Sequence, residues 1–318
     1  MSFSAQVKQE LCRKDGGCPH CLRAEAYGLL LFGKQFGPDG LQISMEHPEA
    51  ARRAAQCIAQ AAGVMVEVSS RLSRRGKTPG AGLCTVSVEG QDACGQVLSC
   101  FGYSGKEAPF LLRTQNFPHA CCLAAFLRGA FLSCGSVTHP QKEYHLEFAL
   151  PRNDLAEGLR QCIASIPDLS IQPSCILRKG SPVVYLKDSE AIADLLTYMG
   201  APGGAMELMQ AKMLKEVRNN INRRTNFENA NLDKTAAAAA RQVIAIETIR
   251  DTVGLQELPQ ELREIAVLRY ENPDLSLREL GESLTPPISR SGVNHRLRRI
   301  LEIAEDLTAE KQNGTEKK

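Results

Sequence analysis

The chain contains an internal duplication, which limits the folds that it can adopt. Residues 22–102 and 123–200 show the same predicted order of elements: a helix, two strands, a helix, two strands and a helix. Residues of the two stretches match at an offset that varies along the chain, as expected if small insertions and deletions separate the two copies. The matched positions are Gly28 with Gly129, Cys57-Ile58 with Cys162-Ile163, Leu98 with Leu196, and Gly102 with Gly200. We therefore predict an α+β region built from two copies of one unit.

Each copy is predicted to begin with an apolar helix and to contain a basic turn between two strands. The apolar helices cover residues 21–33 and 120–133. The basic turns are Arg71–Lys77 in the first copy and Arg178–Gly180 in the second, and strand-like segments flank both. The two turns therefore occupy equivalent places in the repeats.

The composition changes after Gly204. Residues 205–253 contain no proline and include five consecutive alanines, which favour a helix. Between residues 212 and 241 there are seven Lys or Arg and only three acids. Six asparagines lie within residues 219–231, and we expect them to interrupt the helix because Asn is a weak helix former.

Residues 258–308 carry the pattern of a helix-turn-helix. Pro259 suits the first turn of one helix, and Ser276 with Glu279 forms a capping box that opens a second. A third helix is predicted to begin near Ser289, with apolar residues at spacings of three and four. In this motif the third helix enters a major groove, and its first residues lie near base edges.

The third helix is rich in side chains that suit DNA. From Arg290 to Arg299 there are four arginines and no acid. Arg and Asn can make bidentate contacts to base edges, and serines near a helix start suit phosphates. A solvated basic face on a small three-helix bundle is the alternative. The residues predicted to bind DNA are Ser276, Arg278, Ser289, Arg290, Ser291, Asn294, His295, Arg296, Arg298 and Arg299.

Several motifs resemble those of the WhiA family. They are Leu275–Glu282 with Pro286–Arg299, Phe126–Leu132 with Gly135-Ser136, Tyr185–Glu190, and Asn229–Thr235, and the similarity extends from Ser2 to Leu307. The resemblance implies a domain similar to LAGLIDADG homing endonucleases, a linker, and a helix-turn-helix similar to region 4 of sigma factors. It also implies a bacterial DNA-binding regulator, connected with sporulation in filamentous actinobacteria and with cell division or chromosome segregation in Firmicutes.

These patterns together divide the chain into four expected parts. They are a two-repeat LAGLIDADG-like domain at 1–204, a basic helical linker at 205–253, an all-α helix-turn-helix domain at 254–310, and a disordered tail at 311–318.

The formal net charge of +2 does not argue against nucleic acid, because the basic residues are concentrated locally. In a fold similar to homing endonucleases, the two basic turns would lie over DNA. Solvated loops are the alternative interpretation of these turns. The residues predicted to contact phosphates, in the turns and the linker, are Arg71, Arg74, Arg75, Lys77, Arg178, Lys179, Arg223, Arg224 and Lys234.

The resemblance also bears on nuclease activity. Homing endonucleases hold a catalytic metal with an acid near the end of each apolar helix, and those positions fall here on Gly33 and Cys134. Without carboxylates, neither a Mg²⁺ site nor two-metal strand cleavage is expected. Glu46 and Glu147 are nearby acids for which edge or solvent roles are expected. We predict a scaffold that is not an enzyme and has no cofactor, with residual nuclease activity as the alternative.

The twelve cysteines are predicted to be reduced thiols rather than a disulfide scaffold. The first residues lack a signal segment, and no stretch reaches the roughly 18 apolar residues of a membrane span. We therefore expect a cytoplasmic, nucleoid-associated protein with no membrane partner.

Cys18-Pro-His-Cys21 with Cys12 is the best candidate for metal or redox chemistry. A structural zinc site needs four ligands, and a second C-x-x-C is missing. A redox pair lacks the expected thioredoxin-like βαβ setting. We favour buried or loop thiols with no bound metal, and we expect Cys121-Cys122 and Cys134 to lie in the core.

The leading functional hypothesis is a sequence-specific transcription regulator that binds double-stranded DNA, with RNA polymerase or another regulator as a candidate further partner. The alternative is an interaction protein, whose repeat domain binds a division or nucleoid partner while DNA binding is secondary.

Overall fold

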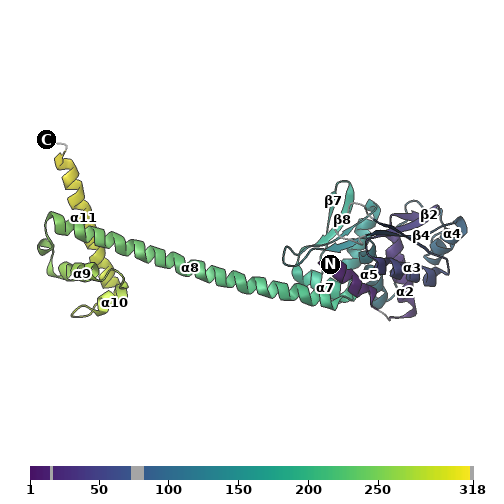
Figure 1. The fold of residues 1–318 in the computed structure, drawn as a ribbon, viewed down its shortest axis with the longest axis horizontal. Coiled ribbons are helices and arrows are strands. Elements are labelled where there is room, and N and C mark those ends of the chain that lie inside the picture. Colours follow the sequence, from purple (N-terminus) through teal and green to yellow (C-terminus); the bar gives the residue numbers. More distant parts are fainter. Residues whose placement is uncertain (15–16, 73–81, 316–318) are drawn as a thin grey trace. The chain divides into compact units, whose positions relative to one another are not determined.

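The computed structural model describes residues 1–14, 17–72 and 82–315, and it divides into two compact units, Met1–Glu216 and Val217–Lys318 (Figure 1). The first unit opens with α1 (Phe3–Cys12) and then contains the two repeats, which η1 (Thr114–Asn116) separates. The first repeat consists of α2 (Pro19–Leu31), β1 (Gln35–Gly37), β2 (Gly40–Met45), α3 (Pro48–Ala62), β3 (Glu67–Leu72), β4 (Gly82–Val88) and α4 (Gln91–Cys100). The second consists of α5 (Ala120–Cys134), β5 (Gly135–Val137), β6 (Leu146–Ala149), η2 (Asn153–Leu155), α6 (Ala156–Ala164), β7 (Ser174–Arg178), β8 (Ser181–Leu186) and α7 (Ser189–Met199).

The two sheets have the same topology. Their strand orders are β1-β2-β4-β3 and β5-β6-β8-β7, and every pair of neighbours is antiparallel. One hydrophobic core extends through both repeats, with aromatic side chains such as Tyr27, Phe126 and Phe131 at its centre. The predicted duplicated α+β fold is confirmed.

The helices α2 and α5 approach each other closely at a matched pair of glycines. A Cβ atom on Gly28 would lie 2.2 Å from the carbonyl oxygen of Phe126, and one on Gly129 would lie 2.2 Å from that of Glu25. Such distances are far inside van der Waals contact, so each glycine allows the opposite backbone to approach. The contact is reciprocal between the repeats, as expected from their duplication.

A buried cluster of charges connects the same two helices. The Glu25 carboxylate on α2 is 1% exposed, and it accepts hydrogen bonds from Arg128 on α5 at 3.0 Å and from Arg53 on α3 at 2.6 Å. Arg128 also donates to the carbonyl oxygen of Met199 at 3.0 Å. A buried carboxylate needs such partners, because an uncompensated buried charge is strongly destabilising.

Helix α8 (Pro202–Thr252) is continuous over 51 residues. The expected interruption within residues 219–231 is therefore wrong. The small cost of each asparagine is offset by the strong helix formers on both sides, and Arg224 forms an ion pair with Glu228 one turn later at 2.9 Å. The beginning of α8 belongs to the first unit, where Ala205 and Leu208 are buried.

The second unit is entirely helical among its described residues. The last part of α8 is followed by η3 (Leu255–Glu257), α9 (Gln260–Glu271), α10 (Leu277–Glu282) and α11 (Arg290–Thr315). Ala245, Ile246 and Ile249 of α8 are buried in the same core as the later helices. The core of this unit thus begins within the expected linker rather than at residue 254.

The end of α11 differs from the predicted disordered tail. The helix includes residues 311–315, because Ala309, Lys311 and Gln312 are good helix formers. Residues 316–318 lie outside the described residues. No helix in the described part of the chain has both the length and the apolar character needed to cross a membrane.

The glycine contact gives a stability prediction with a matched control. Gly28→Ala should lower the free energy of unfolding by about 3 kcal/mol, since the added methyl group meets backbone that cannot move aside. Gly95→Ala on α4 should raise it by about 0.5–1 kcal/mol, because no described atom lies within 4 Å of the added Cβ. Urea denaturation of the full chain measures both. Equal effects of the two substitutions would contradict the proposed role of the close helix contact.

Candidate nucleic-acid interface

The turn between α10 and α11 is held by close backbone packing. Gly281 accepts a hydrogen bond on its carbonyl oxygen from the Ile288 amide at 3.0 Å. A Cβ on Gly281 would lie 2.4 Å from the Ile288 carbonyl oxygen, so only glycine fits without a shift. This packing fixes where α11 begins relative to α10.

The capping box predicted at the start of α10 is present. The Ser276 hydroxyl accepts from the Glu279 amide at 3.3 Å, and the Glu279 carboxylate accepts from the Ser276 amide at 2.8 Å. Ser276, one of the predicted DNA contacts, therefore also has a structural role.

The first turns of α11 carry most of the predicted DNA-binding side chains on an exposed surface. The Ser289 hydroxyl accepts from the Gly292 amide at 3.2 Å and lies 2.9 Å from the Ser291 hydroxyl. Buried Val293, Leu297 and Ile300 fix the opposite face of the helix against the core. The exposed residues are Ser289, Arg290, Ser291, Asn294, His295, Arg298 and Arg299.

Three of the predicted arginines form ion pairs at the surface. Arg278 pairs with Glu282 at 2.9 Å, and both Arg298 and Arg299 lie within 3.8 Å of Glu302. Such exposed pairs are weak, so these arginines could exchange the acid for a phosphate.

Arg296 has a different environment. Its side chain is only 21% exposed, and it pairs with Glu261 on α9 at 3.1 Å. It thus connects two helices of the bundle, a role that its position in an arginine-rich sequence did not reveal.

The predicted phosphate contacts fall on three segments. Arg223, Arg224 and Lys234 are exposed on α8, and Arg71 is exposed on β3. Arg74, Arg75 and Lys77 lie outside the described residues.

The second basic turn is a two-residue hairpin loop between β7 and β8. Lys179 and Gly180 both have positive φ, 51° and 83°, as a tight primed turn requires. Arg178 pairs at 2.8 Å with Glu147, which also bonds to His145 at 2.9 Å. Glu147, expected at an edge or in solvent, therefore belongs to a small polar cluster beside this hairpin.

The carboxyl-terminal ends of α2 and α5 meet at a cavity of about 680 Å³ that Gly33, Cys134, Lys8 and Glu46 help to line. A Cβ on Gly33 would lie 2.7 Å from the Gln42 carbonyl oxygen, which leaves no room for a side chain. The Lys8 ammonium group donates to the Leu132 carbonyl oxygen at 3.2 Å, and burial lowers its pKa. Burial also raises the pKa of Cys134 to about 12, so its thiol is protonated at neutral pH.

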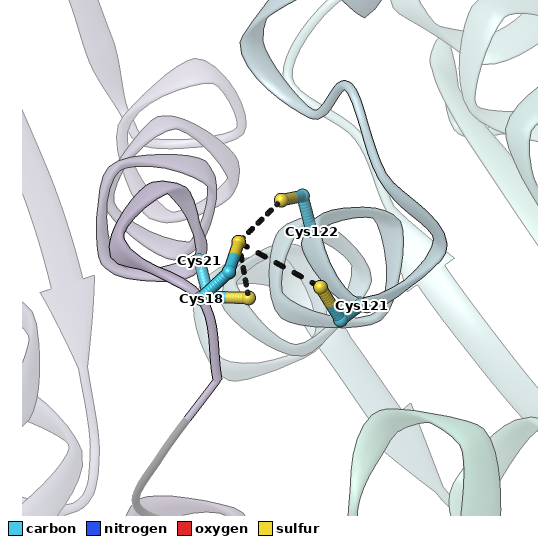
Figure 2. A group of neighbouring side chains, drawn as sticks. All are labelled: Cys18, Cys21, Cys121 and Cys122. Atoms are coloured by element: carbon cyan, nitrogen blue, oxygen red, sulfur yellow. Dashed lines mark hydrogen bonds between the residues drawn. The ribbon is translucent and has the colours of Figure 1, made fainter.

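The opposite, amino-terminal ends of α2 and α5 bring four cysteines together. Cys18, Cys21, Cys121 and Cys122 have their sulfur atoms within 4.8 Å of one another (Figure 2). Cys12, which we considered together with Cys18 and Cys21 from the sequence, is not one of these four cysteines. Cys122 was expected in the core and is buried, whereas Cys121 is exposed.

Comparison with known proteins relates both units to one family. Residues 123–218 match the family model of the WhiA LAGLIDADG-like domain, and residues 221–304 match that of the WhiA C-terminal HTH domain. A "Probable cell division protein WhiA" of Alkaliphilus metalliredigens is 38% identical over 317 residues, which cover 96% of this chain and 98% of that protein. The chain belongs to the WhiA family. A protein of the same name from Ruminiclostridium cellulolyticum is also 38% identical, over 98% of this chain and all of that protein.

A solved WhiA structure agrees with this assignment. The crystal structure of full-length WhiA from Thermotoga maritima has a TM-score of 0.58 and 27% identity, and the match covers 96% of this chain and 99% of that one. The resemblance to WhiA identified from the sequence motifs is therefore confirmed.

The capping box yields a testable prediction for this unit. Ser276→Ala should lower the stability of α10 by about 1 kcal/mol, because the Glu279 amide loses its acceptor. Ser283→Ala is the matched control, since its hydroxyl only donates to the Glu279 carbonyl, which the Ser283 amide already bonds. Amide hydrogen exchange of α10 in the full chain measures both. Similar protection in the two variants would show that the capping box contributes little.

Proposed function

We propose that this chain is a DNA-binding regulator of the WhiA type. The observation that carries the proposal is the acid-free start of α11 in a helix-turn-helix domain, where the exposed residues are Ser289, Arg290, Ser291, Asn294 and His295. Arg290, Asn294 and Arg298 lie at spacings of four, so they share one face of the helix. We infer that this face reads base edges, and that Ser289 and Ser291 bind phosphates at the helix start.

The other basic segments would supply contacts that do not depend on sequence. Arg223, Arg224 and Lys234 on α8 are exposed over a stretch that packs on neither core. Arg71 and the Lys179 hairpin would add phosphate contacts from the repeat domain.

We further infer that the repeat domain is not a nuclease. At the helix ends where homing endonucleases carry acids, Gly33 has no space for a side chain and Cys134 is a protonated thiol. Half-buried Lys8 lines the same cavity, and in its protonated form it would repel a divalent cation. These features support a scaffold that helps to hold DNA without cleaving it.

The biological role that we propose follows the relatives. Their name, probable cell division protein, supports a role in cell division. We extend the proposal to chromosome segregation or sporulation, with the chain acting at the nucleoid. RNA polymerase or another regulator is the further partner that we consider.

Substitutions on α11 test the reading of bases. After selecting a target site from random DNA with the full chain, we expect Arg290→Ala and Asn294→Ala to weaken binding to that site about 5- to 150-fold, because a good base contact contributes about 1–3 kcal/mol. Binding to scrambled DNA should change much less. Fluorescence anisotropy on both DNAs at one salt concentration gives the comparison.

Arg241→Ala on α8 is the matched control, since it removes the same charge from an exposed site outside α11. It should preserve the ratio of the two affinities. If Arg290→Ala and Asn294→Ala also preserve that ratio, α11 binds phosphates rather than bases.

The salt dependence of binding tests the repeat domain. Replacing Arg71 and Lys179 together by Ala should reduce the slope of log K against log salt by about 2, since each phosphate contact contributes about 0.9. Replacing exposed Arg52 and Lys106 by Ala is the charge-matched control, and its slope should stay near that of the unmodified chain. An unchanged slope for the first pair would remove the hairpins from the DNA-binding surface.

A further inference from the structure

The four cysteines at the amino-terminal ends of α2 and α5 are arranged as the ligands of one metal ion would be. The Cys18 sulfur lies 3.7 Å from that of Cys21, 3.7 Å from that of Cys121 and 3.3 Å from that of Cys122. A tetrahedral zinc ion with bonds of about 2.3 Å to sulfur places its ligand atoms about 3.8 Å apart. The observed distances therefore need only small side-chain adjustments to surround an ion.

We propose that Cys18, Cys21, Cys121 and Cys122 bind one structural Zn²⁺ ion that joins the two repeats. Two ligands come from the start of α2 and two from the start of α5, and Cys18 and Cys121 are 103 residues apart in sequence. The ion would bind the four sulfurs as thiolates and release their protons to solvent.

The surroundings suit the negative charge of such a centre. Zinc with four thiolates has a net charge of −2, and both helices direct their amino-terminal ends toward it, with Cys18 as the N-cap of α2 and His119 as the N-cap of α5. The partial positive charge of a helix amino terminus stabilises nearby thiolates. His20 adds a ring nitrogen 3.7 Å from the Cys18 sulfur, and its ring makes an edge contact with that of His119.

The arrangement favours a single ion over other thiol chemistry. All twelve cysteines are free, and the 3.3 Å between Cys18 and Cys122 is well beyond a disulfide bond of about 2.05 Å. In a [4Fe–4S] cluster each cysteine sulfur binds a different iron. The cysteine sulfurs of such a cluster are therefore further apart than sulfurs that bind one shared ion. Four thiolates in a tetrahedral set suit zinc.

A metal ion could reach the four cysteines from solvent and would then join the two central helices. Cys121 is exposed and Cys18 is half-buried, so an ion can reach the cluster from solvent. Because the ligands come from both central helices, the ion would hold these helices together at the end opposite Gly33 and Cys134. The four cysteines are distinct from the residues of the proposed DNA-binding surface. If the chain binds no zinc, the proposal of DNA binding is therefore unchanged.

The test measures metal in the full chain. The chain is expressed without a metal-binding tag, purified under reducing conditions without chelators, and analysed by mass spectrometry of the elements. We expect one zinc per chain, and almost none in Cys18→Ser or Cys121→Ser, which change accessible ligands. Cys175→Ser, an exposed cysteine outside the cluster, should retain one zinc.

Two further measurements separate a tetrathiolate site from adventitious metal. Reconstitution with Co²⁺ should give the intense visible bands of tetrahedral cobalt thiolate, and Cys121→Ser should abolish them. Removing zinc with a chelator should lower the Tm by about 5–10 °C in the unmodified chain and in Cys175→Ser, but not in Cys121→Ser.

Several results would overturn the proposal. One is that the reduced chain contains no zinc and takes none from a chelator of micromolar affinity. Another is that it contains one iron per chain in place of zinc. The third is that zinc persists in both Cys18→Ser and Cys121→Ser.

Discussion

The close approach of α2 and α5 is the contact on which the first unit depends. Gly28 and Gly129 let each helix backbone touch the other, and the buried Glu25–Arg128 pair crosses the same interface. Each sheet continues from the carboxyl-terminal end of one of these helices, so the position of the helix pair also sets the position of both sheets. The duplicated sequence therefore forms one shared core rather than two separate domains.

The helix pair has two chemically different ends. At the carboxyl-terminal ends, Gly33 has no room for a side chain, the Cys134 thiol is protonated at neutral pH, and half-buried Lys8 donates to the Leu132 carbonyl oxygen. At the amino-terminal ends, four thiols converge (Figure 2). The unit thus has a LAGLIDADG-like fold whose central helix pair carries different polar groups at its two ends.

Sequence patterns predicted local features well and failed where residues meet across the fold. The Ser276 capping box depends on residues three apart, so its spacing revealed it. The cysteine group joins residues about 100 positions apart, and its second pair is the adjacent Cys121-Cys122, which has no C-x-x-C spacing. The ion pair of Arg296 depends on Glu261 of another helix, which an arginine-rich sequence does not encode locally.

The sequence by itself determined the duplicated α+β order, the helix-turn-helix and the family, because periodicity, capping and repeated motifs are local and persist in the linear chain. It also located the exposed basic face of α11. Only the tertiary structure decided that the asparagine-rich segment remains helical, that α8 contributes to the second core, and that four cysteines lie close together. These outcomes depend on the helix propensity summed over a long segment and on contacts between residues that are distant in sequence. No single local pattern contains this information.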